Sequence, residues 1–407
     1  MVAYAIGDLR RARELSEELR SINHHNSINA ALGAFSQGGI EMSAGNLVLA
    51  EAEYREAMDI TCRAGGHLWP AAFNLVECAL LAGELNKAER RAREGSVRAG
   101  TDVTFLLPAR ARLAMTRGDI SACLGLLRSM RTEAVTRKSD GSMLEMCKYM
   151  ITSMVSMHAA ERLDPRELED ARAELDAVRD AIQVIAGADG PLWYPIQLLT
   201  LRARLLAVTP AMLNQAVDSS RQALDKARST YPDLIPECGS LLGEHLIQTG
   251  RIDDALVTLD EAEEEAEARG FLKELARIRS ARVCALVLKG ETSAAIEPHV
   301  AALRESLAAT DSPRITAETL RDLALKLPPL SATPDPLSLA EEAHGLFVAM
   351  PMPDEESLCL EAMGDILLAR GRAPEAKRRY VTARARLERH GLGLRLPLLS
   401  RKIDALG

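Results

Sequence analysis

Small and apolar residues recur along this chain at a helical spacing that is broken at regular intervals by glycine or proline. Residues 241–270 and 362–385 carry the same pattern 121 residues apart. With Ala255 as the reference position, a glycine stands five residues before it, and small or apolar residues stand four and seven residues after it. Residues at these spacings share one face of an α-helix. The pattern therefore predicts a helix that begins after the glycine and buries one face.

The same template fits at ten places along the chain. The ten reference positions are Ala12, Ala50, Ala88, Cys123, Ala171, Ala216, Ala255, Ala295, Ala340 and Ala376. Seven units carry the glycine, which we expect in the left-handed conformation that separates one helix from the next. The other three carry Asp164-Pro165, Thr209-Pro210 and Thr333-Pro334, each an N-cap residue followed by a first-turn proline. Both devices predict a tight turn between two helices.

Successive reference positions are 35 to 48 residues apart. Two helical segments per unit at this period are typical of an α-solenoid, in which stacked helical hairpins share one core. A second small residue recurs twelve positions before the reference, for example Gly243 and Gly364. We expect it where the two helices of a hairpin cross, because a missing side chain lets the backbones approach closely.

Residues 242–262 and 363–383 resemble the tetratricopeptide repeat. Each has a small residue in the first helix, a turn glycine, and Ala-x-x-x-aromatic/apolar-x-x-Ala in the second helix. The units are longer than the usual 34 residues of that repeat, and phrases such as GNLVLAEAEYREAMDITCRAGG resemble the MalT-type repeats of large bacterial signal-responsive regulators. The resemblance implies an all-α, right-handed superhelical α-solenoid of about ten hairpins that covers residues 1–407 and binds ligands on its concave face.

The domain organisation follows from the loops. No stretch is long enough to link separate domains, so we expect one solenoid, with a point of flexure at the Pro-rich residues 327–336 and a capping helix within residues 392–407. Regulators of the MalT class also carry an ATPase and commonly a DNA-binding module, and neither motif occurs here. The chain opens within a repeat unit, which is compatible with a segment of a larger protein as well as with a complete one.

Composition supports closely packed helices and narrows the function classes. Hydrophobic residues make up 47% of the chain, but aromatic residues only 3%, and sheets favour aromatic and β-branched residues. A formal net charge of −8 argues against direct nucleic-acid binding. Seven cysteines without a C-x-x-C pair indicate reduced thiols. No signal peptide or membrane-spanning run is present, so we expect a cytoplasmic protein.

No catalytic or metal-binding motif stands out in the sequence. There is no H-E-x-x-H or G-x-S-x-G sequence, and the only adjacent histidines are His24 and His25. His299 and His344 occupy the fourth position after a reference residue, where packing is expected. The sequence therefore predicts a non-enzymatic protein without a metal or cofactor.

The candidate binding residues lie on the first helices. By resemblance to tetratricopeptide repeats, the residue eleven positions before the reference points into the groove. Separately, two phenylalanines stand 38 residues apart at the same place in consecutive units, and a third stands close to that place in the next unit, which suggests an aromatic stripe. The seven candidates are Phe35, Phe73, Glu77, Phe105, Arg112, Glu244 and Asp365. Packing between helices is the alternative role for the aromatic residues.

These residues lead to two functional hypotheses. The first is a module that binds a protein or peptide partner, in bacterial signalling or regulation, through its concave face. The second is the effector-sensing arm of an ATP-dependent transcriptional regulator, with a small-molecule effector as ligand.

Overall fold

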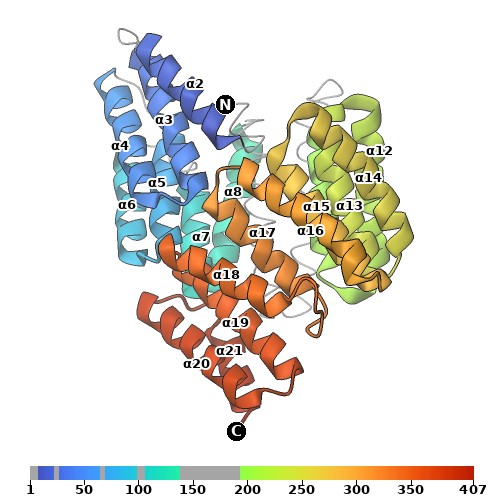
Figure 1. Cartoon of the computed structure of the whole chain (residues 1–407). Coiled ribbons are helices and arrows are strands. Elements are labelled where there is room, and N and C mark those ends of the chain that lie inside the picture. The colour runs from blue at the N-terminus through green and yellow to red at the C-terminus, as the bar shows by residue number, and fades with distance from the viewer. Residues whose placement is uncertain (1–7, 23–26, 65–68, 99–105, 138–192) are drawn as a thin grey trace. The chain divides into compact units, whose positions relative to one another are not determined.

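The computed structural model describes residues 8–22, 27–64, 69–98, 106–137 and 193–407 (Figure 1). These residues form α-helices joined by short turns, and no strand occurs among them. They group into two compact units, one made of residues 1–119 and 292–407 and the other of residues 120–291. We call them unit 1 and unit 2.

Unit 2 begins with α8 and continues with a run of antiparallel helices. Its described helices are α8 (Ile120–Arg137), α11 (Tyr194–Ala207), α12 (Leu213–Thr230), α13 (Ile235–Gln248), α14 (Ile252–Arg269) and α15 (Leu272–Lys289). Helices α11 and α12 pack as one hairpin, α13 and α14 as the next, and α15 packs on both α13 and α14 (Figure 1). Consecutive hairpins share a core that includes Ile196, Leu224 and Leu242.

Unit 1 contains both ends of the chain. Its described helices are α2 (Leu9–Ile22), α3 (Ser27–Ala44), α4 (Leu47–Arg63), α5 (Trp69–Leu81), α6 (Leu85–Arg98), α7 (Leu107–Arg117), α16 (Ser293–Ala309), α17 (Pro313–Lys326), α18 (Pro336–Ala349), α19 (Pro353–Ala369), α20 (Ala373–His390) and α21 (Leu396–Asp404). Packed hairpins are formed by α3–α4, α5–α6, α17–α18 and α19–α20. Tandem helical hairpins, the predicted fold class, are thus confirmed over the described residues. We refer to α3, α5, α7, α11, α13, α15, α17 and α19 as first helices and to the helix after each as a second helix.

The small residue of the first helix lies where the template predicts, at the helix crossing. A Cβ atom added to Gly364 would lie 2.3 Å from the ring of Tyr380, and one added to Gly243 would lie 2.6 Å from Leu259. Tyr380 and Leu259 each stand four residues after a reference position, and both are fully buried. The same pairing recurs between Gly38 and Tyr54, at 2.7 Å. Absence of a side chain on one helix therefore makes room for a large side chain on the other.

The turn glycines take the predicted left-handed conformation. All six that lie in described residues have φ between +70° and +90°, namely Gly45, Gly83, Gly118, Gly250, Gly290 and Gly371. At Gly250 the backbone N–H donates to the carbonyl of Ile247 at 3.0 Å, and the next N–H donates to Leu246 at 2.9 Å. These bonds satisfy carbonyls at the end of the first helix and reverse the chain.

The prediction for the proline units was wrong in its details. Helix α18 begins at Pro336 and not at Pro334, and the side chain of Asp335 caps it by accepting from the N–H groups of Leu337 and Ser338. An aspartate caps well and its charge suits a helix N-terminus, which explains why the second Asx/Thr-Pro pair in the sequence TPDP is used. Thr209 accepts no capping bond.

Pro210 opens a 3₁₀ turn (Pro210–Met212) that precedes α12. Asp164-Pro165 and the unit around Ala171 lie outside the described residues.

At the end of the chain, α21 packs on α20 within the residues for which the sequence predicts a cap. The predicted point of flexure, residues 327–336, is bonded to the C-cap residue of α19. Nε of Arg370 donates to the carbonyl of Pro329 at 2.8 Å, and the guanidinium pairs with Asp335. No helix among the described residues has the length and apolar character needed to span a bilayer.

Candidate functional site

Three of the charged groove candidates, Glu77, Arg112 and Glu244, lie in ion pairs with neighbouring first helices. Glu77 of α5 is buried, and its carboxylate lies 3.4 Å from Nε of Arg112 on α7. The structure thus brings together two residues that stand at the same place in consecutive units. The sequence predicted each residue as a groove candidate, but it did not predict that the two contact each other.

In unit 2, charged side chains from three consecutive first helices gather around Glu244. Arg277 of α15 lies 3.7 Å from Glu244 of α13, and Arg204 of α11 lies 3.8 Å from Glu237 of α13. Glu274 of α15 lies 3.3 Å from Arg277. We call these five residues the first-helix charge cluster. It holds three carboxylates and two guanidiniums, and their side chains are 18% to 37% exposed.

The contacts around Asp365, at the same repeat position as Glu244, are shorter. Its carboxylate accepts from Nζ of Lys402 at 2.7 Å and from the hydroxyl of Tyr380 at 2.7 Å. Lys402 also donates to the buried Glu361 at 2.7 Å, and Arg395 pairs with Glu361 as well. Asp365 and Glu361 therefore hold α21 against the last hairpin.

These contacts shift the pKa values of Glu361, Lys402 and Tyr380. Burial alone would raise the pKa of Glu361, but the charges of Arg395 and Lys402 outweigh it, so the pKa lies below its usual value. Burial would lower the pKa of Lys402, yet Glu361 and Asp365 raise it overall. Burial, followed by the bond to Asp365, raises the pKa of Tyr380. Each of the three shifts favours the ordinary charge state of its group at neutral pH.

The predicted aromatic stripe is in contact with the core. Phe35 packs on Tyr54, with ring centroids 5.6 Å apart, and it borders the cluster around Leu75. Phe73 is 6% exposed. Both positions match the packing role that the sequence left open. Phe105 lies outside the described residues, as do His24 and His25.

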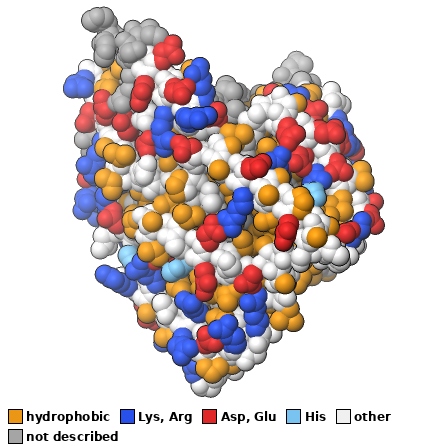
Figure 2. All heavy atoms as spheres, viewed as in Figure 1, with side chains coloured by type: hydrophobic (Ala, Val, Ile, Leu, Met, Phe, Trp, Pro, Cys, Tyr) orange, Lys and Arg blue, Asp and Glu red, His pale blue; other side chains and the backbone are white. Residues whose placement is uncertain are grey.

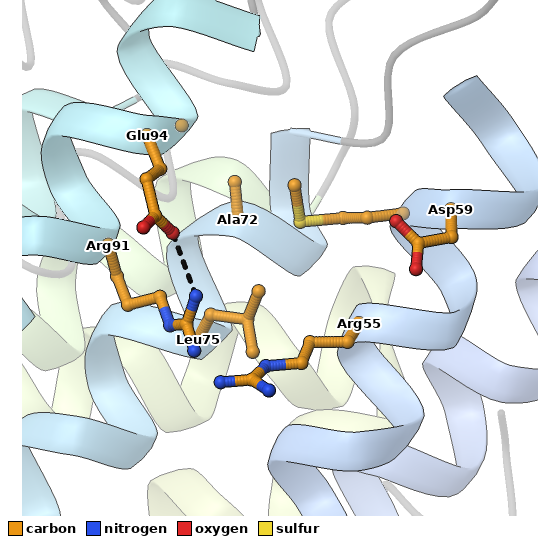
Figure 3. Close-up of a pocket in the computed structure, with 8 residues that line it drawn as sticks. Arg55, Asp59, Ala72, Leu75, Arg91 and Glu94 are labelled. Carbon is orange, nitrogen blue, oxygen red and sulfur yellow. Dashed lines mark hydrogen bonds and ion pairs between the residues drawn. The ribbon is translucent and has the colours of Figure 1, made fainter. Parts of the chain in front are cut away.

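Sequence reasoning missed the cavities on the second-helix side of the hairpins. One of about 220 Å³ lies between α4, α5 and α6, with Arg55 and Asp59 on one side and Arg91 and Glu94 on the other (Figure 3). The guanidinium of Arg91 donates to Glu94 at 2.7 Å and to Glu51 at 2.9 Å. The guanidinium of Arg55 also donates to Glu51, at 2.5 Å. The positive charges here are thus paired with carboxylates of the protein itself.

A second cavity, of about 360 Å³, lies between α18, α19 and α20. His344, which the sequence assigns to packing, is half-buried there, and burial lowers the pKa of its imidazole. No cluster of three or more potential metal ligands occurs in the part of the chain that the structure describes. Figure 2 shows acidic and basic side chains interspersed over the visible face of unit 2. In unit 1, basic side chains are more prominent over α20 and α21 (Figure 2).

Searches of family models and of curated proteins give no match. Among solved structures, a Rap protein complexed with competence and sporulation factor is similar at a TM-score of 0.44 and 10% identity, over 83% of this chain and 97% of that one. A STAND ATPase with a tetratricopeptide repeat sensor from Pyrococcus horikoshii is similar at a TM-score of 0.38 and 12% identity, over 96% of this chain and 56% of that one. Yeast Tom70 is similar at a TM-score of 0.33 and 12% identity, over 93% of this chain and 95% of that one.

Proposed function

We propose that this chain is a non-enzymatic helical-repeat module that binds a protein or peptide partner along its first helices. The observation that supports the proposal is the first-helix charge cluster of unit 2. It combines charges of both signs from α11, α13 and α15 on one partly exposed surface. The affinity of a ligand that contacts all three helices depends on the relative position of three successive repeats.

The two contacts that join neighbouring first helices in the cluster are ion pairs without a direct hydrogen bond. The contacts from Arg277 to Glu244 and from Arg204 to Glu237 are 3.7 Å and 3.8 Å, longer than a hydrogen bond. A partner segment with its own acidic and basic side chains adds charge-assisted bonds to these partly exposed groups. Partly exposed ion pairs contribute little to folding, so the exchange costs the module little stability.

The choice of partner class follows from the extent of the cluster. Side chains spread over three helices suit an extended segment better than a small molecule, which binds in a concave and mostly apolar pocket. The three acids and two bases favour a peptide that carries both charges with a small excess of positive charge.

The test is a selection of displayed peptides on the intact chain, followed by affinity measurements on variants. Replacing Glu244 with Gln (Glu244→Gln) removes one acceptor charge and is expected to weaken the selected peptides about tenfold. The matched control is Glu264→Gln on the second helix α14, where Glu264 is exposed. Peptides that bind the wild-type chain and both variants equally would contradict the proposal. Circular dichroism of each variant excludes a loss of fold.

A further inference from the structure

The cavity between α18, α19 and α20 has mainly apolar walls. Helix α18 contributes Val348 and the ring of His344, α19 contributes Leu360, and α20 contributes Ala385. Leu360 is 4% exposed and Val348 is 46% exposed, so the cavity runs from the core to the surface. A volume of about 360 Å³ suits a group of side-chain size.

A buried carboxylate also lines this cavity. Glu356 is 2% exposed and lies in the first turn of α19, where the helix N-terminus favours a negative charge. Its Oε2 accepts from Nε of Arg386 at 2.7 Å. Its other oxygen, Oε1, is buried and has no hydrogen-bond partner among the described residues. Buried polar atoms are rarely left unbonded, because desolvation without a hydrogen bond is costly.

The surroundings of Oε1 restrict what can bind there. A carboxylate oxygen only accepts, so the ligand must donate an N–H or O–H. Arg386 and Arg389 also line the cavity, and their positive charges disfavour an ammonium group. His344 does not offset these charges, because an imidazole is either neutral or positive. The donor that fits is therefore neutral.

The two arginines also indicate that the apolar part of the ligand is a flat aromatic ring. Guanidinium groups lie favourably over aromatic faces, and Leu360 provides an apolar floor. We propose that this cavity binds an aromatic group that carries one neutral N–H or O–H donor, of the class of indoles and phenols, with that donor on Oε1 of Glu356. This site is separate from the first-helix charge cluster and does not rest on the proposed function.

The test compares two probes on the full chain by calorimetry and by NMR of the Leu360 methyl groups. Indole is expected to bind and to shift these signals. 1-Methylindole has nearly the same ring but no donor, and it is expected to bind at least about tenfold more weakly, because it leaves Oε1 unbonded. Equal affinities for the two probes would overturn the proposal.

Two variants of α20 check the location. Ala385→Trp places a large side chain at the wall of the cavity and is expected to abolish indole binding. Val381→Trp adds a similar side chain on the same helix at a 40% exposed position outside the lining, and it is expected to retain binding. Ala385 is exposed, so both variants should fold. Unchanged indole binding by Ala385→Trp would place the ligand elsewhere and contradict the assignment.

The same chemistry has two sources, a free small aromatic molecule or a Trp side chain of a partner. N-Acetyltryptophanamide presents the indole within a peptide-like backbone. Binding as tight as that of indole would identify an inserted side chain as the occupant, whereas a loss of at least about tenfold would identify a free molecule. Failure of all three probes to bind would refute the site.

Discussion

Two carboxylates at the same repeat position, Glu244 in unit 2 and Asp365 near the end of unit 1, have different surroundings. The carboxylate of Glu244 lies 3.7 Å from the guanidinium of Arg277, whereas that of Asp365 bonds both Lys402 and Tyr380 at 2.7 Å. The repeat template places both side chains on the first-helix face. It does not decide whether they face a ligand or hold the structure together.

The neighbouring element explains the difference. The side chain that meets Asp365 comes from α21, a short helix that follows the last hairpin, and α21 also supplies Arg395 from its N-cap position. One helical turn before Asp365 stands the buried Glu361, whereas the same position in unit 2 is Ser240. The last hairpin therefore has an acid where unit 2 has a serine, and this acid binds the cap.

The largest effect should come from Glu361. We expect Glu361→Gln to lower the free energy of unfolding by about 3 kcal/mol, because it leaves Arg395 and Lys402 without a buried partner charge. The measurement is urea unfolding followed by circular dichroism. The matched change in unit 2, Ser240→Ala, removes a hydroxyl that has no partner among the described residues and should alter stability by less than about 0.5 kcal/mol.

The pH dependence sharpens the same prediction. The pKa of Glu361 is lowered in the folded protein, so its contribution is present above the ordinary pKa of 4.5 and is lost as the pH falls through the folded value. Wild-type stability should consequently decline more steeply below pH 4.5 than that of Glu361→Gln. Parallel curves for the two proteins would show that this carboxylate does not stabilise the cap.

The helix crossings should give the next effect in size. Gly364→Ala places a methyl group against the ring of Tyr380, which is buried and rigid, and should cost about 2 kcal/mol. Gly243→Ala meets the flexible end of Leu259 and should cost less. Gly345→Ala on α18 has open space around it and is expected to stabilise by up to about 1 kcal/mol. A similar outcome at all three glycines would contradict the close helix crossings.

Much of the fold follows from short-range signals in the sequence. The turn at Gly250 and the contact of Gly364 with Tyr380 depend on residues of one hairpin, so a repeated template is sufficient to predict them. The start of α18 does not follow in this way, because TPDP offers two capping residues, and only the packed helix selects Asp335.

The candidate site is less accessible to prediction, because its contacts join different hairpins. Glu244 was predicted, but its partner Arg277 stands seven residues away from the equivalent place in the next unit. The buried Glu356 was not singled out, although an acid in the first turn of an apolar helix was the available signal. Loop lengths and helix register decide which side chains of successive repeats meet.

The most direct test of the account measures peptide affinity and unfolding together for Glu244→Gln and Asp365→Asn. We predict that Glu244→Gln weakens a selected peptide about tenfold and leaves the free energy of unfolding within about 0.5 kcal/mol of wild type. Asp365→Asn should show the reverse, a loss of about 1 kcal/mol in stability with peptide affinity unchanged. Equal effects of the two substitutions on binding and on stability would contradict the division of roles between them.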